Sequence, residues 1–161
     1  MDIRPATPDD DDAIWRVLQP VFRAGETYPI PRDISRAEAL AYWHTSGHHV
    51  FVAEDMGGVV GTYYLRANQR GGGSHVANCG YVVADEQTQK GVARAMCIHS
   101  IEQAKQLGFR AMQFNFVVST NSRAVKLWHS MGFATVGTLP HAFHHPTRGH
   151  VDAYVMFRTL S

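Results

Sequence analysis

The residues best placed for chemistry surround a glycine at the point where a polar stretch meets an amphipathic one. Asp85 to Lys90 is polar, Gly91 follows, and Ala93 and Arg94 lie just beyond it. The first turn of a helix has unpaired N–H groups and partial positive charge, which together bind phosphate. The small residues at 91 and 93 allow a pyrophosphate to approach the backbone, and the flanking lysine and arginine add charge. An ordinary strand-to-helix turn fits the same residues, because short glycine motifs often occur by chance.

A second block begins about 30 residues later and reads Asn121-Ser-Arg-Ala124-Val-Lys-Leu127-Trp128-His-Ser-Met131-Gly132-Phe133. It is similar to the Asn-x-x-Ala-x-x-Leu-Tyr-x-x-x-Gly-Phe block of the GNAT superfamily of acyltransferases. The glycine turn resembles the acetyl-CoA motif of that superfamily, Gln/Arg-x-x-Gly-x-Gly/Ala, and departs from it at Thr88. Two blocks in the right order are far more specific than either alone. The resemblance extends from about Ile3 to Arg158.

The resemblance implies a fold, an activity and a cosubstrate. The expected fold is the GNAT fold of the α/β (α+β) class, with a mixed, mostly antiparallel sheet of about seven strands, four flanking helices and a splayed central strand pair. The expected activity is transfer of an acetyl group from acetyl-CoA to the amine of a small molecule. The residues expected to bind acetyl-CoA are Tyr81, Val82, Val83, Thr88, Gln89, Lys90, Gly91, Val92, Ala93, Arg94, Asn121, Ala124 and Trp128.

The resemblance also predicts how the reaction is supported. In the family the amine attacks the thioester directly, so no nucleophilic side chain is needed, and Cys79 is interpreted as a core thiol. A backbone N–H near Val82 is expected to face the thioester oxygen as it gains negative charge. Two departures remove the usual proton-transfer groups: Trp128 replaces a tyrosine acid, and Asn78 replaces a glutamate base. Neither an indole nor an amide exchanges protons usefully near neutral pH.

Two asparagines are predicted to take the place of these groups. Strand alternation puts Asn78 on one face with Val82, and it puts Asn115 on one face with Gln113 and Val117. If the two faces meet at the splay, the amides flank the acetyl group, where they orient the amine or bind a substrate carboxylate. The alternative is that both amides satisfy backbone groups in a distorted sheet.

Three stretches are similar to a narrower group, the fungal acetyltransferases of proline analogues, which acetylate azetidine-2-carboxylate and related cyclic imino acids. They are Ser74 to Asn78, Asn115 to Val118 and Gly25 to Pro29. This similarity implies a functional role for both strand asparagines and a cyclic imino acid or amino acid as acceptor. Glu26 and Tyr28 lie in the loop expected to cover the acceptor, and we predict that they contact the substrate. Loop residues of this kind are as often packing or capping residues.

A particular order of helices and strands must position these residues. Turn residues and hydrophobic periodicity predict that order. Helices are predicted over 8–22, 34–44, 91–107 and 121–131, the first capped by Thr7 and the second by Asp33 or Ser35. Strands are predicted over 2–6, 49–54, 59–65, 75–83, 110–118, 133–139 and 151–159. The apolar stripe of the third helix is Ala93, Cys97, Ile101 and Ala104, widened by Met96 and Leu107. Helices then flank one sheet, with a parallel strand pair around the third helix.

Composition narrows the class of protein. The chain has 161 residues, and residues 1–161 are predicted to form a single domain. A net charge of +1 leaves no broad electrostatic case for nucleic acid or a membrane surface. The first residues do not resemble a signal peptide, and no apolar run approaches the ~20 residues that span a bilayer. Two cysteines without CxxC spacing favour reduced thiols, so a cytoplasmic location is expected. A homodimer is common among relatives.

Histidines are numerous, at ten in the chain. His141, His144, His145 and His150 cluster near the predicted final hairpin loop. A metal site needs three or more converging ligands, and Asp152 is the carboxylate nearby. We therefore expect no metal, and interpret the cluster as an exposed loop bordering the acceptor site.

Two other functions fit the same residues. One is acetylation of a protein N-terminus or lysine, which the near-neutral charge does not favour. The other is a non-catalytic acyl-CoA sensor, suggested by the loss of the usual tyrosine and glutamate, which predicts CoA binding without turnover. A dinucleotide-binding domain is disfavoured, because the chain has no GxGxxG motif and mainly hairpin topology.

Overall fold

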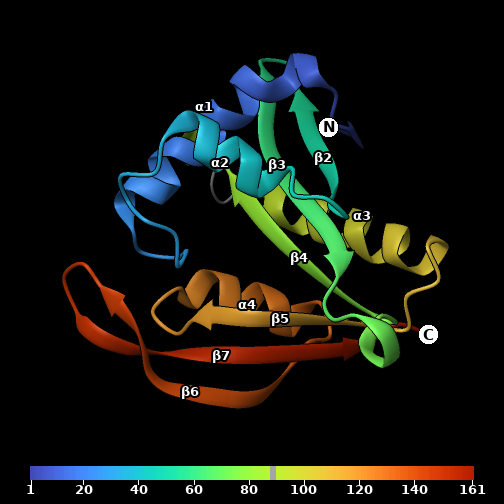
Figure 1. Ribbon diagram of the computed structural model, residues 1–161, viewed down its shortest axis with the longest axis vertical. Helices are drawn as coiled ribbons and strands as arrows, with labels where there is room; N and C mark the ends of the chain where they lie inside the picture. Colours follow the sequence, from blue (N-terminus) through green and yellow to red (C-terminus); the bar gives the residue numbers. More distant parts are fainter. Residues whose placement is uncertain (88–89) are drawn as a thin grey trace.

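The computed structural model describes residues 1–87 and 90–161, and Figure 1 shows a twisted sheet flanked by helices. The helices are α1 (Asp11–Ala24), α2 (Arg36–Trp43), α3 (Val92–Gln106) and α4 (Ser122–Ser130), with short 3-10 helices at Pro8–Asp10, Gly71–Gly73 and Asp85–Gln87. The strands are β1 (Asp2–Pro5), β2 (His49–Asp55), β3 (Gly58–Ala67), β4 (Val76–Val83), β5 (Ala111–Val118), β6 (Ala134–His145) and β7 (Gly149–Thr159). They form one sheet in the order β1-β2-β3-β4-β5-β7-β6. The pair β4–β5 is parallel and the other five pairs are antiparallel, which confirms the predicted sheet.

Local sequence explains where the helices begin and end. Ser35 caps α2, because its hydroxyl accepts the N–H of Glu38 at 3.1 Å and the Glu38 carboxylate accepts the N–H of Ser35 at 3.2 Å. This reciprocal capping box decides between the two predicted caps. The first helix differs more from its prediction, because Pro8–Asp10 form a 3-10 helix before α1 begins at Asp11. Gly25, at φ 65°, then ends α1 slightly later than predicted.

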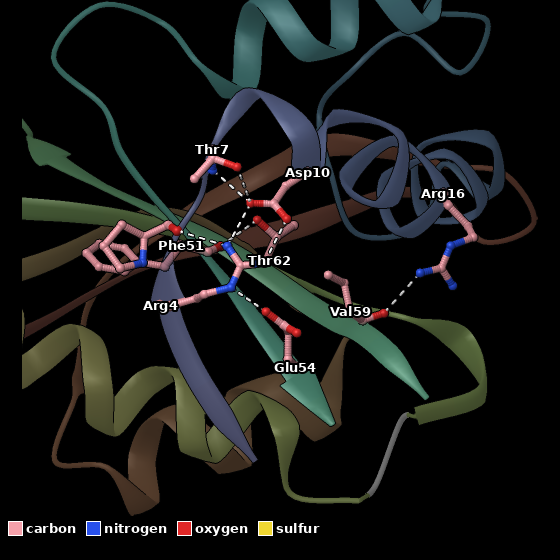
Figure 2. Close-up of polar contacts among 9 residues, drawn as sticks. Arg4, Thr7, Asp10, Arg16, Phe51, Glu54, Val59 and Thr62 are labelled. Carbon is pink, nitrogen blue, oxygen red and sulfur yellow. Dashed lines mark hydrogen bonds and ion pairs between the residues drawn. The ribbon is translucent and has the colours of Figure 1, made fainter. Parts of the chain in front are cut away.

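A buried carboxylate joins β1 to the start of α1. Figure 2 shows both oxygens of Asp10 accepting hydrogen bonds from the Arg4 guanidinium, each at 2.8 Å, while the N–H of Thr7 donates a third at 2.7 Å. Arg4 also bonds to Glu54 on β2. The hydrogen bond from Arg4 is the main reason that the pKa of Asp10 is lowered to about 2, since it favours the charged form. This network fastens the edge of the sheet to the helix that follows it.

Each face of the sheet is covered by two helices. The core under α1 and α2 contains Ile14, Leu18 and Trp43, all fully buried. The core under α3 and α4 contains Met96 and Met112, which are buried to the same extent. Burial of apolar surface on both faces is the main force that holds such a layered fold together.

Two predictions about the elements are wrong. Leu107 is exposed, because α3 ends at Gln106 and Gly108, at φ 88°, turns the chain out of the helix toward β5. The C-terminal hairpin is longer than predicted, since β6 continues to His145 and β7 already begins at Gly149. The residues assigned to a loop therefore belong mostly to paired strands.

The parallel pair in the centre of the sheet opens along its length. Within the described residues, β4 and β5 pair only at Val76 with Ala111 and at Ala77 with Met112. Beyond these positions the two strands diverge, as Figure 1 shows. The predicted splayed pair is confirmed. It leaves unpaired backbone on the facing edges of both strands, which must be satisfied by other groups.

Candidate functional site

A cavity of about 780 Å³ follows the opening between β4 and β5. The predicted site residues that line it are Glu26, Tyr28, Asn78, Tyr81, Val82, Val83, Gly91, Val92, Ala93, Arg94, Asn115, Asn121, Ala124 and Trp128. Lys90 is exposed and is not part of the described lining, and Thr88 and Gln89 lie outside the described residues. One continuous cavity thus brings together the residues predicted for cosubstrate and for acceptor.

One end of the cavity, here called the helix end, is formed by the first turns of α3 and α4. Gly91 caps α3 with φ 81°, a left-handed conformation that glycine adopts without strain. Among the described residues, and leaving aside its chain neighbours, no atom lies within 4 Å of a Cβ placed at Gly91, so these residues leave the space in front of the turn open. The turn can therefore admit a phosphate group to the helix N-terminus. Arg94 lies in the first turn of α3, and its guanidinium donates to the Ser130 hydroxyl at 2.9 Å.

The start of α4 completes the helix end. Asn121 caps this helix, since its side-chain oxygen accepts the N–H of Ala124 at 3.4 Å. Arg123, which sequence reasoning missed, also lines the cavity and is exposed. Trp128 is buried with its ring 5.1 Å from that of Tyr81 and 4.9 Å from that of Phe114, measured between centroids. At the position of the family's tyrosine, Trp128 therefore serves as an apolar wall.

The backbone N–H and C=O groups of β4 point alternately toward β3 and toward the gap, which is the opening between β4 and β5. Ala84, just past β4, donates its N–H to β3 at 2.9 Å, and the register with β3 is unbroken along the strand. Even-numbered residues such as Val82 therefore direct their backbone groups to β3, while Tyr81 and Val83 direct theirs to the gap. In agreement, the Tyr81 carbonyl accepts a hydrogen bond from the Tyr28 hydroxyl at 3.0 Å. Alternation moves the N–H predicted near Val82 to one of its two neighbours.

Asn78 lies where β4 and β5 begin to separate. It is buried, and its side-chain N–H donates to the backbone carbonyl of Gln113 across the fork at 2.9 Å. This bond takes the place of the next backbone hydrogen bond between β4 and β5. The amide therefore satisfies a backbone group, as the alternative interpretation of the asparagines expects. Asn78 also lines the cavity, and no hydrogen bond from another described residue uses its side-chain oxygen. Asn78 therefore links β4 to β5 at the point where they separate, and it also presents polar atoms to the cavity.

The side chain of Asn115 bonds to other side chains, whereas that of Asn78 bonds to the backbone. It is exposed, and its side-chain N–H donates to the side-chain oxygen of Asn68 at 2.7 Å. Its own oxygen accepts an N–H from Gln113 at 2.9 Å. The grouping of Val117 with this face is wrong, because a bulge between Phe114 and Val117 inserts one residue and turns Val117 toward the core under α3 and α4.

The end of the cavity around Asn78 and Asn115, here called the acceptor end, is also lined by tyrosines. Tyr28 lies over β4, and Tyr64 on β3 lies beside it. A Cβ at Gly80 would lie 2.5 Å from the Tyr64 ring and 3.0 Å from the Tyr28 hydroxyl, so glycine is required there. Sequence reasoning missed Tyr64, although strand alternation on the predicted strand 59–65 was the signal that could have found it.

Burial shifts the pKa values of the reactive side chains around the cavity. Burial raises the pKa of the Tyr28 and Tyr64 phenols well above the usual value, so both remain protonated near neutral pH and act as hydrogen-bond donors. It also raises the pKa of the Cys79 and Cys97 thiols to about 12. Both cysteines are free and buried, as predicted. A thiol that stays neutral is a poor nucleophile.

The histidine cluster is arranged by the C-terminal hairpin. His144 on β6 stacks on His150 of β7, with ring centroids 4.6 Å apart. His145 is buried and accepts the backbone N–H of Thr147 at 3.1 Å. Among the described residues, no three His, Cys, Asp or Glu side chains gather as metal ligands do. No helix in residues 1–87 and 90–161 has the length and apolar character needed to cross a membrane.

Comparison with known proteins agrees with this geometry. The acetyltransferase (GNAT) family matches residues 12–133 of the chain. The N-acetyltransferase aca1 of Schizosaccharomyces pombe is 28% identical over 148 residues, which cover 81% of this chain and 71% of that protein.

Solved structures show the same fold. A GCN5-related N-acetyltransferase from Kribbella flavida is 43% identical with a TM-score of 0.93, and the match covers 99% of this chain and 97% of that one. YncA from Salmonella typhimurium, solved with its cofactor acetyl-CoA, is 23% identical with a TM-score of 0.87, and the match covers 100% and 94%.

Proposed function

Because this chain belongs to the acetyltransferase (GNAT) family, we propose that it transfers the acetyl group of acetyl-CoA to the amine of a small molecule. The observation that carries the proposal is the opening between β4 and β5, which continues as one cavity to the N-terminus of α3. Such a cavity offers unpaired strand backbone at one end and a phosphate-binding helix start at the other. The proposal includes the small-molecule acceptor and the roles of individual residues in binding and transfer.

The residues of the helix end fit acetyl-CoA. The space in front of Gly91 is open, and the turn presents the N–H groups of α3 to it. Arg94 and Arg123 line the same region and supply positive charge for phosphates. The acetyl-CoA bound by Salmonella YncA, which shares the fold, supports the same cosubstrate here. When bound, acetyl-CoA supplies the thioester whose acetyl group is transferred.

The chain would assist the transfer mainly through backbone and amide groups. Tyr81 and Val83 direct backbone N–H groups to the gap, and one of them would stabilise the oxygen of the attacked carbonyl. Asn78 would orient the attacking amine from the acceptor end, since its side-chain oxygen is free to accept an N–H. Cys79 would take no part, because burial raises the pKa of its thiol to about 12.

Proton transfer would not depend on a strong base. The described cavity lining contains no histidine, and its carboxylates are Glu26 and Asp85. An amine that arrives deprotonated, or loses its proton to water, needs no dedicated base to attack the thioester. The departing thiolate would take its proton from water, because burial raises the pKa of the Tyr28 phenol and makes it a weak acid.

We further propose a cyclic imino acid, or an amino acid, as acceptor. The acceptor end is lined by Tyr28, Tyr42 and Tyr64, whose rings suit a small apolar ring. Asn78 and Asn115 lie beside these rings and offer the polar contacts that such a molecule needs. The proposal includes the predicted cytoplasmic location and homodimer, which fractionation and sedimentation would check.

The test is an assay of thiol released from acetyl-CoA against a panel of amines. The panel contains azetidine-2-carboxylate, hydroxyproline isomers, primary amino acids, polyamines and short peptides. Turnover confined to cyclic imino acids and amino acids is expected. Turnover confined to peptides would replace the small-molecule proposal with protein acetylation. Tight acetyl-CoA binding without turnover of any acceptor would favour the sensor function instead.

A further inference from the structure

Arg66 is a cationic residue of the acceptor end that the proposed reaction leaves without a role. It lies near the end of β3, where its position in the register is directly opposite Asn78 on β4. It lines the cavity, two residues beyond Tyr64 and therefore on the same face of the strand. Its Nε–H donates to the backbone carbonyl of Ala67 at 3.1 Å, which fixes the base of the guanidinium.

The guanidinium of Arg66, which is exposed, has no anionic partner among the described residues. No ion pair in residues 1–87 and 90–161 includes Arg66. Glu26, the carboxylate of the loop after α1 that lines the same cavity, is exposed and makes no ion pair with it among the described residues. The outer nitrogens of Arg66 thus remain available to a ligand. A guanidinium binds a carboxylate through two parallel N–H donors, which gives both charge and orientation.

The amides around Arg66 present mostly donors. The side-chain oxygens of Asn68 and Asn115 already accept hydrogen bonds, at 2.7 Å from Asn115 and 2.9 Å from Gln113. Each amide nitrogen carries two N–H groups, and Asn78 and Asn115 each use one of theirs within the protein. Apart from the Asn78 side-chain oxygen, the groups left over in this part of the cavity are therefore N–H donors beside a positive charge, an arrangement that suits an anion.

Arg66 is too far from the helix end to serve the phosphates of the cosubstrate. The five residue-to-residue steps from Asn78 to Val83 span about 17 Å of extended strand before the turn that precedes α3 begins. Arg94 and Arg123 already supply cations at that end. The anion for Arg66 must then belong to the acceptor.

We infer that Arg66 binds a carboxylate group of the acceptor, so that the enzyme selects amines that carry an acid. The inference rests on the proposed function and deepens it by assigning the selectivity to one residue. The carboxylate would lie against Arg66 and the N–H groups of Asn78 and Asn115, with the ring of the acceptor toward Tyr64. Arg66 would act on binding and not on the transfer itself, so its loss would raise the KM of the acceptor.

The experiment pairs a change in the enzyme with a change in the acceptor. Azetidine-2-carboxylate is compared with its carboxamide, which keeps the ring and the amine and lacks the charge. KM and kcat are measured for the wild type, Arg66→Gln, Arg66→Lys and the control Arg70→Gln. Arg70 is exposed on the glycine-rich loop and lies outside the described lining of the cavity.

The wild type is expected to prefer the carboxylate. Arg66→Gln should raise the KM for the carboxylate by about 10- to 100-fold and change that for the carboxamide less than about twofold. Arg66→Lys should recover part of the preference, because lysine keeps the charge without the paired donors. Arg70→Gln should behave as the wild type. Equal effects of Arg66→Gln on both acceptors, or no effect on either, would overturn the inference.

Equilibrium binding separates this inference from the proposed function. Calorimetry on the CoA-loaded protein compares the two acceptors in the wild type and in Arg66→Gln. Tighter binding of the carboxylate that depends on Arg66, without acetylation, would contradict the proposed function and leave the inference standing. If the wild type binds the carboxylate no more tightly than the carboxamide, the inference is wrong whether or not either is acetylated.

Discussion

The helix end and the acceptor end of the cavity would recognise their proposed ligands with different atoms. At the helix end, the contacts come largely from the backbone of one turn, where Gly91 caps α3 and leaves open space. At the acceptor end they come from side chains on separate elements, such as Tyr28 after α1, Arg66 on β3 and Asn115 on β5. Backbone recognition would tolerate a change such as Thr88 in the motif. Recognition by side chains changes with each residue, so we expect specificity to be set at the acceptor end.

The largest effect on activity is expected at Asn78, where β4 and β5 begin to separate. Asn78→Asp removes the N–H that bonds to Gln113 and places a negative charge beside the acceptor. We expect kcat/KM for the acceptor to fall about 100- to 1,000-fold, because both positioning and charge are lost. Steady-state kinetics check this, with Asn115→Ala as a comparison that should cost less because Asn115 is exposed. A greater loss in Asn115→Ala would reverse the roles assigned to the two asparagines.

A smaller effect, confined to the cosubstrate, is expected at the helix end. Gly91→Ala places a methyl group where phosphate must approach and strains a residue at φ 81°. The KM for acetyl-CoA should rise about 10-fold, with little change in the KM for the acceptor. Gly108→Ala is the matched control, because Gly108 has φ 88°, also faces open space and lies outside the described cavity lining. If both variants raise the KM for acetyl-CoA, backbone strain and not phosphate binding is responsible.

The bond from the loop after α1 to β4 should matter less. Tyr28→Phe removes the hydrogen bond to the Tyr81 carbonyl and keeps the ring. A net hydrogen bond contributes about 1 kcal/mol, so kcat/KM should fall about 3- to 10-fold. Tyr63→Phe is the control, since it loses a comparable bond to His99 on the opposite face of the sheet. An equal fall in both variants would mean that lost stability explains the effect.

The Arg4–Asp10 network should affect stability and not catalysis. The pKa of Asp10 is lowered to about 2 in the folded protein, so its stabilising effect is complete above the ordinary value of 3.8 and is lost as the pH falls toward 2. Asp10→Asn should lower the free energy of unfolding at pH 7 by about 1 kcal/mol, a figure reduced by the partial exposure of Arg4. Urea titrations at pH 2 to 7 test this. Asp12→Asn, whose ion pair with Arg36 is exposed, should change little.

The smallest expected effect concerns Cys79. Burial raises the pKa of its thiol to about 12, so it should form no acetyl-enzyme at pH 7 to 9. Protein quenched during turnover and digested for mass spectrometry should carry no acetyl group on this cysteine. An adduct on Cys79 that forms and decays at the rate of turnover would show a covalent route.

Prediction from sequence succeeded where the signal was local. Gly91 and Asn121 act at the ends of their own helices, so a few neighbouring residues were enough to assign them, and for α2 they narrowed the cap to Asp33 or Ser35. It was less complete where strand pairing intervened. The bulge after Phe114 turned Val117 to the other face, and only the pairing with β3 showed that the N–H groups directed to the opening near Val82 are those of Tyr81 and Val83. Strand alternation within one segment contains no information about bulges or about which neighbour receives a given N–H.

The amino-acid sequence by itself determined the order of elements, the glycine turn before α3 and the family, because turn residues, helix caps and apolar periodicity act over a few residues. Only the tertiary structure decided the acceptor end. The register that sets Arg66 opposite Asn78, the bond from Asn78 to Gln113 and the space that Gly80 leaves for Tyr64 each join distant segments. Such contacts depend on how strands pair and pack, and no local pattern specifies that.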